Sequence, residues 1–311
     1  MTESMTQHPA RRISRRAAMG YGGALAAVIA SARLLSPAVA QNTATPAAPS
    51  DWAALDEQVA AVAPTAAMLA TELIDGEIAP VHALNADQIL PVGSSFKLWI
   101  LGALAMQVEA GTLDWEQVVE IEDRYRSVPG GDLRYVAAGT PFTMRYLAER
   151  MIQKSDNTAT DHMLFLAGRE NVEQAMTAMG VSEPDRNIPL FSTRELTMLK
   201  FASPTDRIDA YFASDAEQRR RILTDEIARI PYEALADLDQ TAPIEIDRVE
   251  WFATREDLAR TMAWLHLASR RPGLRPVTEI LSLETPIPFD GEIWSYVGYK
   301  GGSEMGVLSG T

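Results

Sequence analysis

Hydrophobic positions follow helical spacing in some segments of the chain and strand spacing in others, and the order of these segments indicates the fold class. A helix is predicted over 52–62, followed by two short strands over 66–74 and 80–85. The segment 114–140 is predicted to be a loop, and a last strand is predicted over 293–299. Further helices are predicted, in chain order, over 94–110, 143–154, 157–168, 171–179, 193–201 and 255–269. Strands at both ends with helices between them predict an α+β fold.

The helix predicted over 94–110 contains one unusual charge. Lys97 is its only charged residue before Glu109, and a helix that is apolar on every face is expected to be buried. A buried ammonium is costly unless it is paired or deprotonated, and the first turn of a helix disfavours a cation. Ser94 lies three residues earlier on the same face, so a lysine with a lowered pKa could accept its hydroxyl proton. A serine cap followed by a lysine that extends to solvent is the alternative.

Two further motifs gain meaning from their order. Ser155-Asp156-Asn157 alone is equally a helix start, and Lys300-Gly301-Gly302-Ser303 alone is equally a glycine turn after a strand. Together with Ser94-x-x-Lys97, they resemble the ordered signature of class A β-lactamases and penicillin-binding proteins. The third motif departs from that family at its second position, because it begins K-G-G. The flanking segments extend the resemblance over about residues 51–303.

The resemblance implies a serine hydrolase that works through an acyl-enzyme intermediate. Ser94 would be acylated by a β-lactam or a related acyl donor, and Lys97 would take or relay its proton. Ser155 would pass a proton to the leaving nitrogen. The implied fold is β-lactamase/transpeptidase-like, with an antiparallel sheet flanked by helices and an all-α subdomain.

The resemblance also implies a set of substrate-binding residues. Asn157 would hold Lys97 and the amide side chain of the substrate, and Lys300 would bind a substrate carboxylate. Gly302 and Ser303 would contact the substrate, and the N–H groups of Ser303 and Ser94 would form the oxyanion hole.

Class A enzymes also use a glutamate to activate the deacylating water, and Glu195 is the best candidate here. Leu199 stands where the family has an asparagine, and Ser192 with Glu195 is equally a capping box that opens a helix. Without a base the acyl-enzyme would turn over slowly. Hydrolysis of β-lactams is therefore the leading hypothesis, an esterase or DD-peptidase is the alternative, and a non-catalytic acylated sensor is a third.

Residues 1–40 have the pattern of an export signal. A basic region that contains Arg15-Arg16 precedes an Ala/Gly-rich run, and Ala38-Val39-Ala40 resembles a cleavage site. The arginine pair favours the twin-arginine route, with an ordinary secretory signal as the alternative. The mature protein is then expected in the periplasm or outside the cell. Residues 41–50 are predicted to be a linker, and 51–311 the catalytic domain, with a helical insert at about 202–250.

Composition excludes several functions. The net charge is −14 and becomes more negative without the signal, so nucleic acid and anionic lipid are not expected as partners. There is no cysteine, and the four histidines have no metal-ligand spacing, so we expect neither a metal nor an organic cofactor. A small-molecule β-lactam or a cell-wall-like peptide is the expected substrate, and a monomer is the expected state.

The chain stops eight residues after Ser303, whereas the family continues with two more strands and a helix. We therefore expect an incomplete sheet, as in a truncated fragment or a degenerate gene product. The insert at about 202–250 is hypothesised to cover the mouth of the active site, from its place in the sequence alone.

Overall fold

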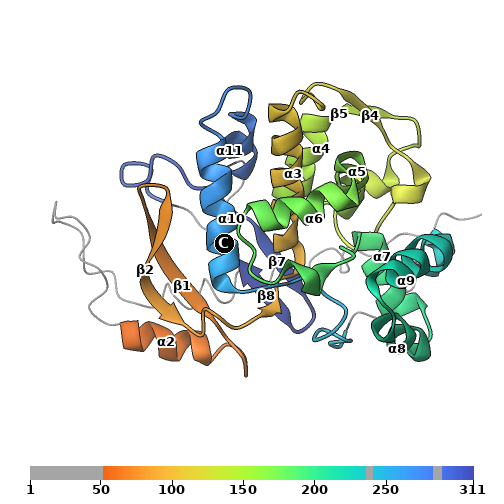
Figure 1. The fold of residues 1–311 in the computed structure, drawn as a ribbon, viewed down its shortest axis with the longest axis horizontal. Coiled ribbons are helices and arrows are strands. Elements are labelled where there is room, and N and C mark those ends of the chain that lie inside the picture. Colours follow the sequence, from red (N-terminus) through yellow and green to blue (C-terminus); the bar gives the residue numbers. More distant parts are fainter. Residues whose placement is uncertain (1–51, 236–240, 283–288) are drawn as a thin grey trace, which may run out of the picture. The chain divides into compact units, whose positions relative to one another are not determined.

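The computed structural model describes residues 52–235, 241–282 and 289–311, which belong to one compact unit. Its α-helices (Figure 1) are α2 (Trp52–Ala60), α3 (Lys97–Glu109), α4 (Met144–Gln153), α5 (Asn157–Ala167), α6 (Arg169–Ala178), α7 (Thr193–Thr197), α8 (Thr205–Ala213), α9 (Ala216–Arg221), α10 (Arg255–Ala268) and α11 (Pro276–Leu281). Within these ranges, no helix is long and apolar enough to cross a membrane. The export signal and the linker predicted over 1–50 lie outside the described residues.

The described strands form antiparallel pairs. β1 (Met68–Ile74) pairs with β2 (Glu77–Leu84), and the register shifts between Ala70 and Thr71. The other pairs are short: β3 (Leu90–Pro91) with β6 (Phe252–Ala253), β4 (Val118–Glu120) with β5 (Pro141–Thr143), and β7 (Gly301–Glu304) with β8 (Val307–Gly310). The predicted α+β class with antiparallel strands and many helices is confirmed.

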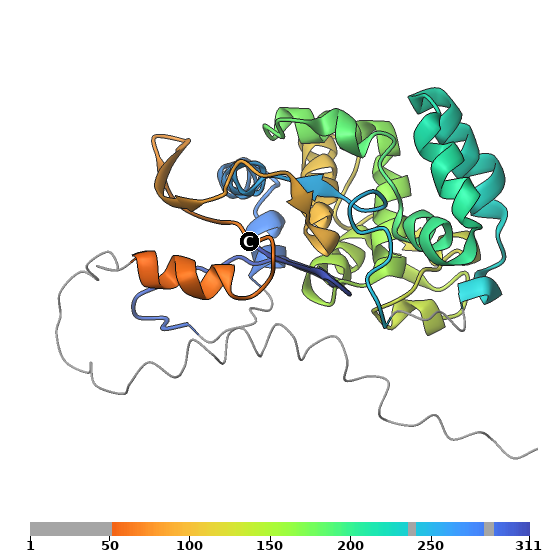
Figure 2. The ribbon, with the colours of Figure 1, turned by 90° about the horizontal axis from the view of Figure 1, so that it is seen from below.

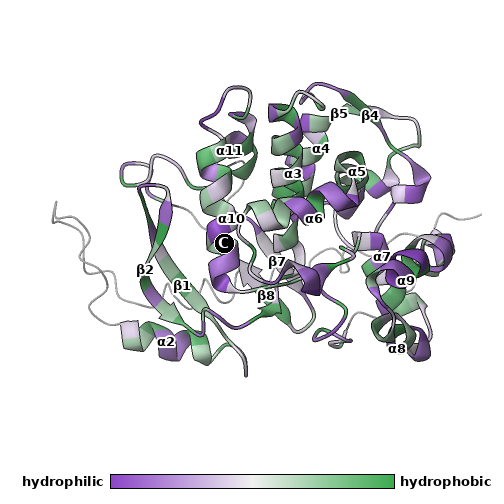
Figure 3. Ribbon diagram, viewed as in Figure 1, coloured by the Kyte–Doolittle hydropathy of each residue, from purple (hydrophilic) through white to green (hydrophobic). Residues whose placement is uncertain are grey.

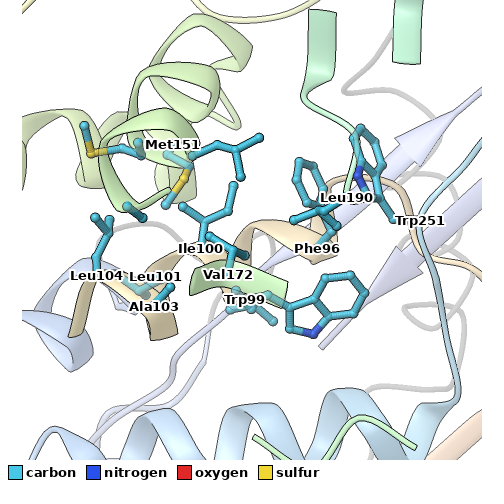
Figure 4. Packing of buried hydrophobic residues seen from close by; sticks show 14 of the residues in the cluster. Phe96, Trp99, Ile100, Leu101, Ala103, Leu104, Met151, Val172, Leu190 and Trp251 are labelled. Atoms are coloured by element: carbon cyan, nitrogen blue, oxygen red, sulfur yellow. The ribbon is translucent and has the colours of Figure 1, made fainter. Parts of the chain in front are cut away.

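Helix α3 is the centre of the hydrophobic core. Every residue from Lys97 to Ala105 is buried, and α4, α5, α6 and α10 all contact this helix. Figure 3 shows α3 as mostly hydrophobic, whereas the exposed helix α9 carries three arginines in a row. Figure 4 shows Phe96, two residues after Ser94, beside Trp251. The rings of Phe96 and Trp251 stack with their centroids 3.7 Å apart. The residues that follow Ser94 are therefore anchored in the hydrophobic core.

Helix α10 lies between two parts of the unit, because it contacts β1 and β2 on one side and α3 and α11 on the other. Helices α8 and α9 of the insert lie far from the β1–β2 hairpin in both Figure 1 and Figure 2. Helix α8 packs beside the π-helical turn η7 (Met198–Ala202), which continues α7, and α9 packs against α8.

Most predicted helices are found within a few residues of their expected bounds, and the first strand pair is confirmed. The strand predicted over 293–299 is wrong. Tyr299 N donates to Leu281 O at the end of α11 (3.0 Å), so this N–H group is not available to a strand partner, and the strand starts at Gly301. Residues 114–140 are not wholly a loop, because β4 lies within them. Of the two strands expected after Ser303, the described chain contains β8.

Candidate active site

The nucleophile segment is a 3₁₀ helix, η3 (Gly93–Phe96), that leads directly into α3 and leaves Ser94 half-buried. It packs backbone to backbone against β7. A Cβ on Gly302 would lie 2.1 Å from Val92 O and 2.5 Å from Ser94 N, and one on Gly93 would lie 3.0 Å from Ser303 N. Gly93 also has φ +49°, which favours glycine. The glycines at 93 and 302 thus allow the Ser303 strand to lie beside Ser94.

Lys97 is the first residue of α3, and the end of its side chain contacts the Ser155-Asp156-Asn157 segment. Nζ donates to Ser155 O at 2.7 Å, to Ser155 Oγ at 2.9 Å and to Asn157 Oδ1 at 2.7 Å. The lysine is completely buried. Lys97, Ser155 and Asn157, which the sequence predicts to act together, are therefore brought into direct contact.

The environment of Lys97 favours its neutral form. Burial lowers the pKa of Lys97 well below its ordinary value, and the nearby Lys300 lowers it further, against two aspartate carboxylates that raise it. The three hydrogen bonds that Nζ donates use the three N–H groups of an ammonium, and loss of the proton from the bond to Ser155 Oγ gives the neutral amine. This arrangement can pass a proton between Lys97 and Ser155.

Lys300 approaches the same serine from β7. Its Nζ donates to Ser155 Oγ at 3.2 Å and to Gly301 O at 2.5 Å. The backbone of Lys300 is held by a pair of hydrogen bonds with Thr311, of 2.9 and 3.1 Å. Burial lowers the pKa of Lys300 to about 7. Ser155 Oγ therefore lies within hydrogen-bond distance of two buried lysines.

The segment that carries Ser155 and Asn157 is held in a strained conformation. Ser155 has φ 53°, in the left-handed region that non-glycine residues adopt at a cost. Asp156 is buried and caps α5, where its carboxylate accepts from Ala159 N (2.8 Å) and from Leu133 N (3.0 Å). Asn157 Nδ2 donates to Pro129 O at 2.5 Å. These contacts fix the segment and orient its side chains toward Lys97.

The carboxylate of Glu195 is held by Arg169 of α6. Glu195 forms the capping box with Ser192, and its carboxylate accepts two hydrogen bonds from Arg169, of 2.6 and 2.9 Å. Thr193 and Thr197, which lie on the other face of α7, contact Asn157 O and Val128 O respectively. The capping box is therefore confirmed, whereas the role of Glu195 as a deacylating base stays a prediction.

Asp161 is a buried acid that the sequence analysis did not select. Its carboxylate accepts from Thr193 N and Thr193 Oγ1 (both 2.7 Å) and from Arg194 N (2.9 Å). Burial raises the pKa of Asp161 to about 6, although the bonds from Thr193 and Arg194 oppose this. Asp161 ties α7 to α5 next to Asn157. It is the only acidic residue between Asp156 and Glu170, which was the signal that could have identified it.

Solved structures share this fold. A β-lactamase from Sphaerobacter thermophilus superposes with a TM-score of 0.54 and 20% identity, over 84% of this chain and 82% of that one. A β-lactamase from Chitinophaga pinensis gives a TM-score of 0.50 and 16% identity, over 80% of this chain and 77% of that one. No curated protein sequence gives a significant match.

The family is shown by sequence. The model of the β-lactamase enzyme family matches residues 52–224, which are more than half of the chain and include α3, the Ser155 segment and α7. The protein therefore belongs to the β-lactamase enzyme family and is a β-lactamase-like serine hydrolase.

Proposed function

We propose that the protein hydrolyses β-lactams through an acyl-enzyme on Ser94. The observation that carries this proposal is the position of Ser155 Oγ, 2.9 Å from Lys97 Nζ and 3.2 Å from Lys300 Nζ. Two lysines with lowered pKa values on one hydroxyl form a route for protons. No metal or organic cofactor takes part in the proposed reaction.

In acylation, Ser94 Oγ attacks the β-lactam carbonyl carbon, and its proton passes to Lys97, directly or through the Ser155 hydroxyl. The N–H groups of Ser94 and Ser303 stabilise the oxyanion. The C–N bond of the ring then breaks, and Ser155 gives a proton to the leaving nitrogen, replaced by one from Lys97. Lys300 binds the substrate carboxylate, and Asn157 with Gly302 and Ser303 holds the acyl part. Water then hydrolyses the ester on Ser94 and restores the serine.

A second candidate function, a penicillin-binding or peptidase activity with slow deacylation, is favoured by the geometry of Glu195. Both of its carboxylate oxygens accept hydrogen bonds from Arg169, and the pair is buried. A carboxylate held in this way is poorly placed to take a proton from a water on Ser94. A cell-wall-like peptide is then the alternative substrate class.

Intact mass measured during reaction with a fluorescent penicillin tests both functions. We expect an adduct on the wild type and none on Ser94→Ala. An adduct that clears within the assay supports β-lactam hydrolysis, and one that persists supports the second candidate. No adduct on the wild type would contradict both.

We also propose that the protein is exported as a monomer, by the twin-arginine route, and acts in the periplasm or outside the cell. The support is the pattern of residues 1–40 and the acidic composition. The domain boundaries proposed are a signal over 1–40, a linker over 41–50 and the catalytic domain over 51–311. The export route is tested by expressing the protein in bacteria with and without the change Arg15→Lys/Arg16→Lys, and by measuring its activity in the periplasmic and cytoplasmic fractions.

In the insert at about 202–250, Pro243 and Ile246 pack against Gly306 at the turn of the β7–β8 hairpin.

A further inference from the structure

A buried cluster of charged side chains lies at the end of β7, outside the residues assigned above. Lys200 Nζ donates to Glu304 Oε1 at 2.6 Å and lies 3.7 Å from Glu250 Oε1. The side chains of Lys200 and Glu250 are 0% and 1% exposed, and that of Glu304 is 24% exposed. Two of the three side chains are thus removed from water, which is costly unless their charges are balanced.

The charges of this cluster balance at neutral pH. Burial and the nearby Glu304 carboxylate together raise the pKa of Glu250 to about 8, against the Lys200 ammonium, which lowers it. Glu250 is therefore mostly protonated at neutral pH, while one of its oxygens accepts from Trp251 N at 3.0 Å. Lys200 then pairs with one carboxylate, that of Glu304. The ion pair of interest is thus Lys200–Glu304, with Glu250 as a neutral neighbour.

This ion pair joins two sides of the candidate active site, namely β7, which carries Ser303, and the α7 segment, which contacts Asn157. Glu304 directly follows Ser303 in β7, the strand that lies against Ser94. Lys200 belongs to η7, which continues α7, and Thr193 and Thr197 of α7 contact the Asn157 side of the site. The β7 strand that carries Ser303 and the α7 segment that contacts Asn157 are far apart in sequence. An ion pair between them therefore restrains the distance between these two sides of the site.

The hairpin is short, so such a link adds to the packing of β7 against η3. β7 and β8 have four residues each, and a hairpin of this size is marginally stable alone. One end of the hairpin is held by the Lys300–Thr311 pair and by Ser95 Oγ, which donates to Ser309 Oγ at 3.2 Å. Glu304, beside the turn, is held by Lys200. Without Lys200 the Ser303 end would lose its charged restraint.

We propose that Lys200 and Glu304 are positioning residues for acyl transfer: their ion pair holds the Ser303 strand at the distance from the Asn157 side of the site that the oxyanion hole requires. Oxyanion stabilisation depends on donors placed to within about half an ångström, so a looser strand slows acylation without removing any catalytic group. The kinetic part of this inference rests on the proposed acylation of Ser94, whereas the structural part does not.

The experiment compares wild type, Lys200→Met, Lys200→Arg and Glu304→Gln, with Arg221→Met as control. Arg221 pairs with Glu217 on the surface of α9, so its loss removes an ion pair remote from the strand. Two quantities are measured on each full-length protein: the rate of Ser94 acylation by a fluorescent penicillin over a range of concentrations, and amide hydrogen exchange of peptides that cover 300–311. Circular dichroism in the near ultraviolet checks that each variant has native packing.

For Lys200→Met, we expect acylation at saturating penicillin to fall about tenfold or more, with the half-saturating concentration nearly unchanged, because the lost geometry matters in the transition state. Exchange over 300–311 should be faster than in the wild type. Lys200→Arg should restore both quantities in large part, and Glu304→Gln, which tests the pair if Lys200→Met does not fold, should lie between. Arg221→Met should match the wild type.

Unchanged exchange over 300–311 in both folded Lys200→Met and Glu304→Gln would overturn the proposal, and so would faster exchange with unchanged acylation. If the wild type is not acylated at all, the proposed function fails. The exchange measurement still decides whether Lys200 holds the strand, so the two failures are distinguishable.

Discussion

Arg169 donates two hydrogen bonds, of 2.6 and 2.9 Å, to the two carboxylate oxygens of Glu195, and both side chains are buried. Arg169 also donates to Leu190 O, and the Glu195 carboxylate accepts from Ser192 N at 2.8 Å. The glutamate that a class A comparison nominates as a base is thus part of a structural ion pair. This relationship makes its chemical role and its structural role separable by mutation.

Glu195→Gln should reduce stability strongly and leave deacylation nearly unchanged. Removal of one partner of a buried ion pair leaves the other charge uncompensated, which costs about 3–5 kcal/mol. Urea unfolding and the decay rate of the acyl-enzyme are the measurements, with Glu217→Gln, from an exposed pair, as control. A large fall in deacylation for a protein that is still folded would identify Glu195 as the base after all.

Lys300 should make substrate binding depend on pH. Its pKa is lowered to about 7 by burial, so its charge is present below about pH 7 and is lost as the pH rises through this value. The affinity of Ser94→Ala for a penicillin, which carries a carboxylate, should therefore fall above about pH 7. Lys300→Arg keeps its charge and should flatten the profile. Identical profiles for the two proteins would show that another group controls binding.

Gly302→Ala should abolish or greatly slow acylation. The added methyl group would lie 2.1 Å from Val92 O and 2.5 Å from Ser94 N, which are backbone atoms that cannot turn aside. The strand must then move away from Ser94, and loss of one oxyanion donor alone costs about a hundredfold or more in rate. Gly291→Ala is the matched control, because a methyl group there meets no atom within 4 Å. Near-normal labelling of Gly302→Ala by a fluorescent penicillin would contradict the assigned contact.

Glu250 should make the fold less stable as the pH rises. Its pKa is raised from 4.5 to about 8 in the folded protein, so between these values the folded state holds a proton that the unfolded state has lost. The free energy of unfolding then falls with pH, by up to about 1.4 kcal/mol per pH unit from this one group. Glu250→Gln lacks this proton and should not show this contribution. Urea unfolding of both proteins at about pH 5.5 and about pH 7.5 measures the difference.

Local sequence patterns predicted those structural features that depend on contacts between residues close in sequence. The apolar run of α3 and the misplaced charge of Lys97 led to the buried lysine, and Ser192 with Glu195 led to the capping box. The position of β7 was not predictable in this way, because Tyr299 bonds to Leu281 at the end of α11 rather than continuing the strand.

Interactions between distant residues were also beyond the reach of the sequence. Lys200 and Glu304 are 104 positions apart, and neither has a local signature of pairing. The pairing of Glu195 with Arg169 depends on how α6 and α7 pack, which spacing alone does not give. By contrast, the contact of Lys97 with Ser155 and Asn157 was predictable, because the order of the motifs resembles that of a family in which these residues meet in one site.

The stack of Phe96 and Trp251 gives the protein a built-in optical reporter. The indole ring lies face to face with a residue two positions after Ser94, at a centroid distance of 3.7 Å, and Val92 N donates to Trp251 O at 2.9 Å. Indole emission responds to changes in nearby polarity and ring contact. A covalent group on Ser94 that shifts the nucleophile turn should therefore change the fluorescence of Trp251, so that acylation and its reversal can be followed in real time with an unlabelled ligand.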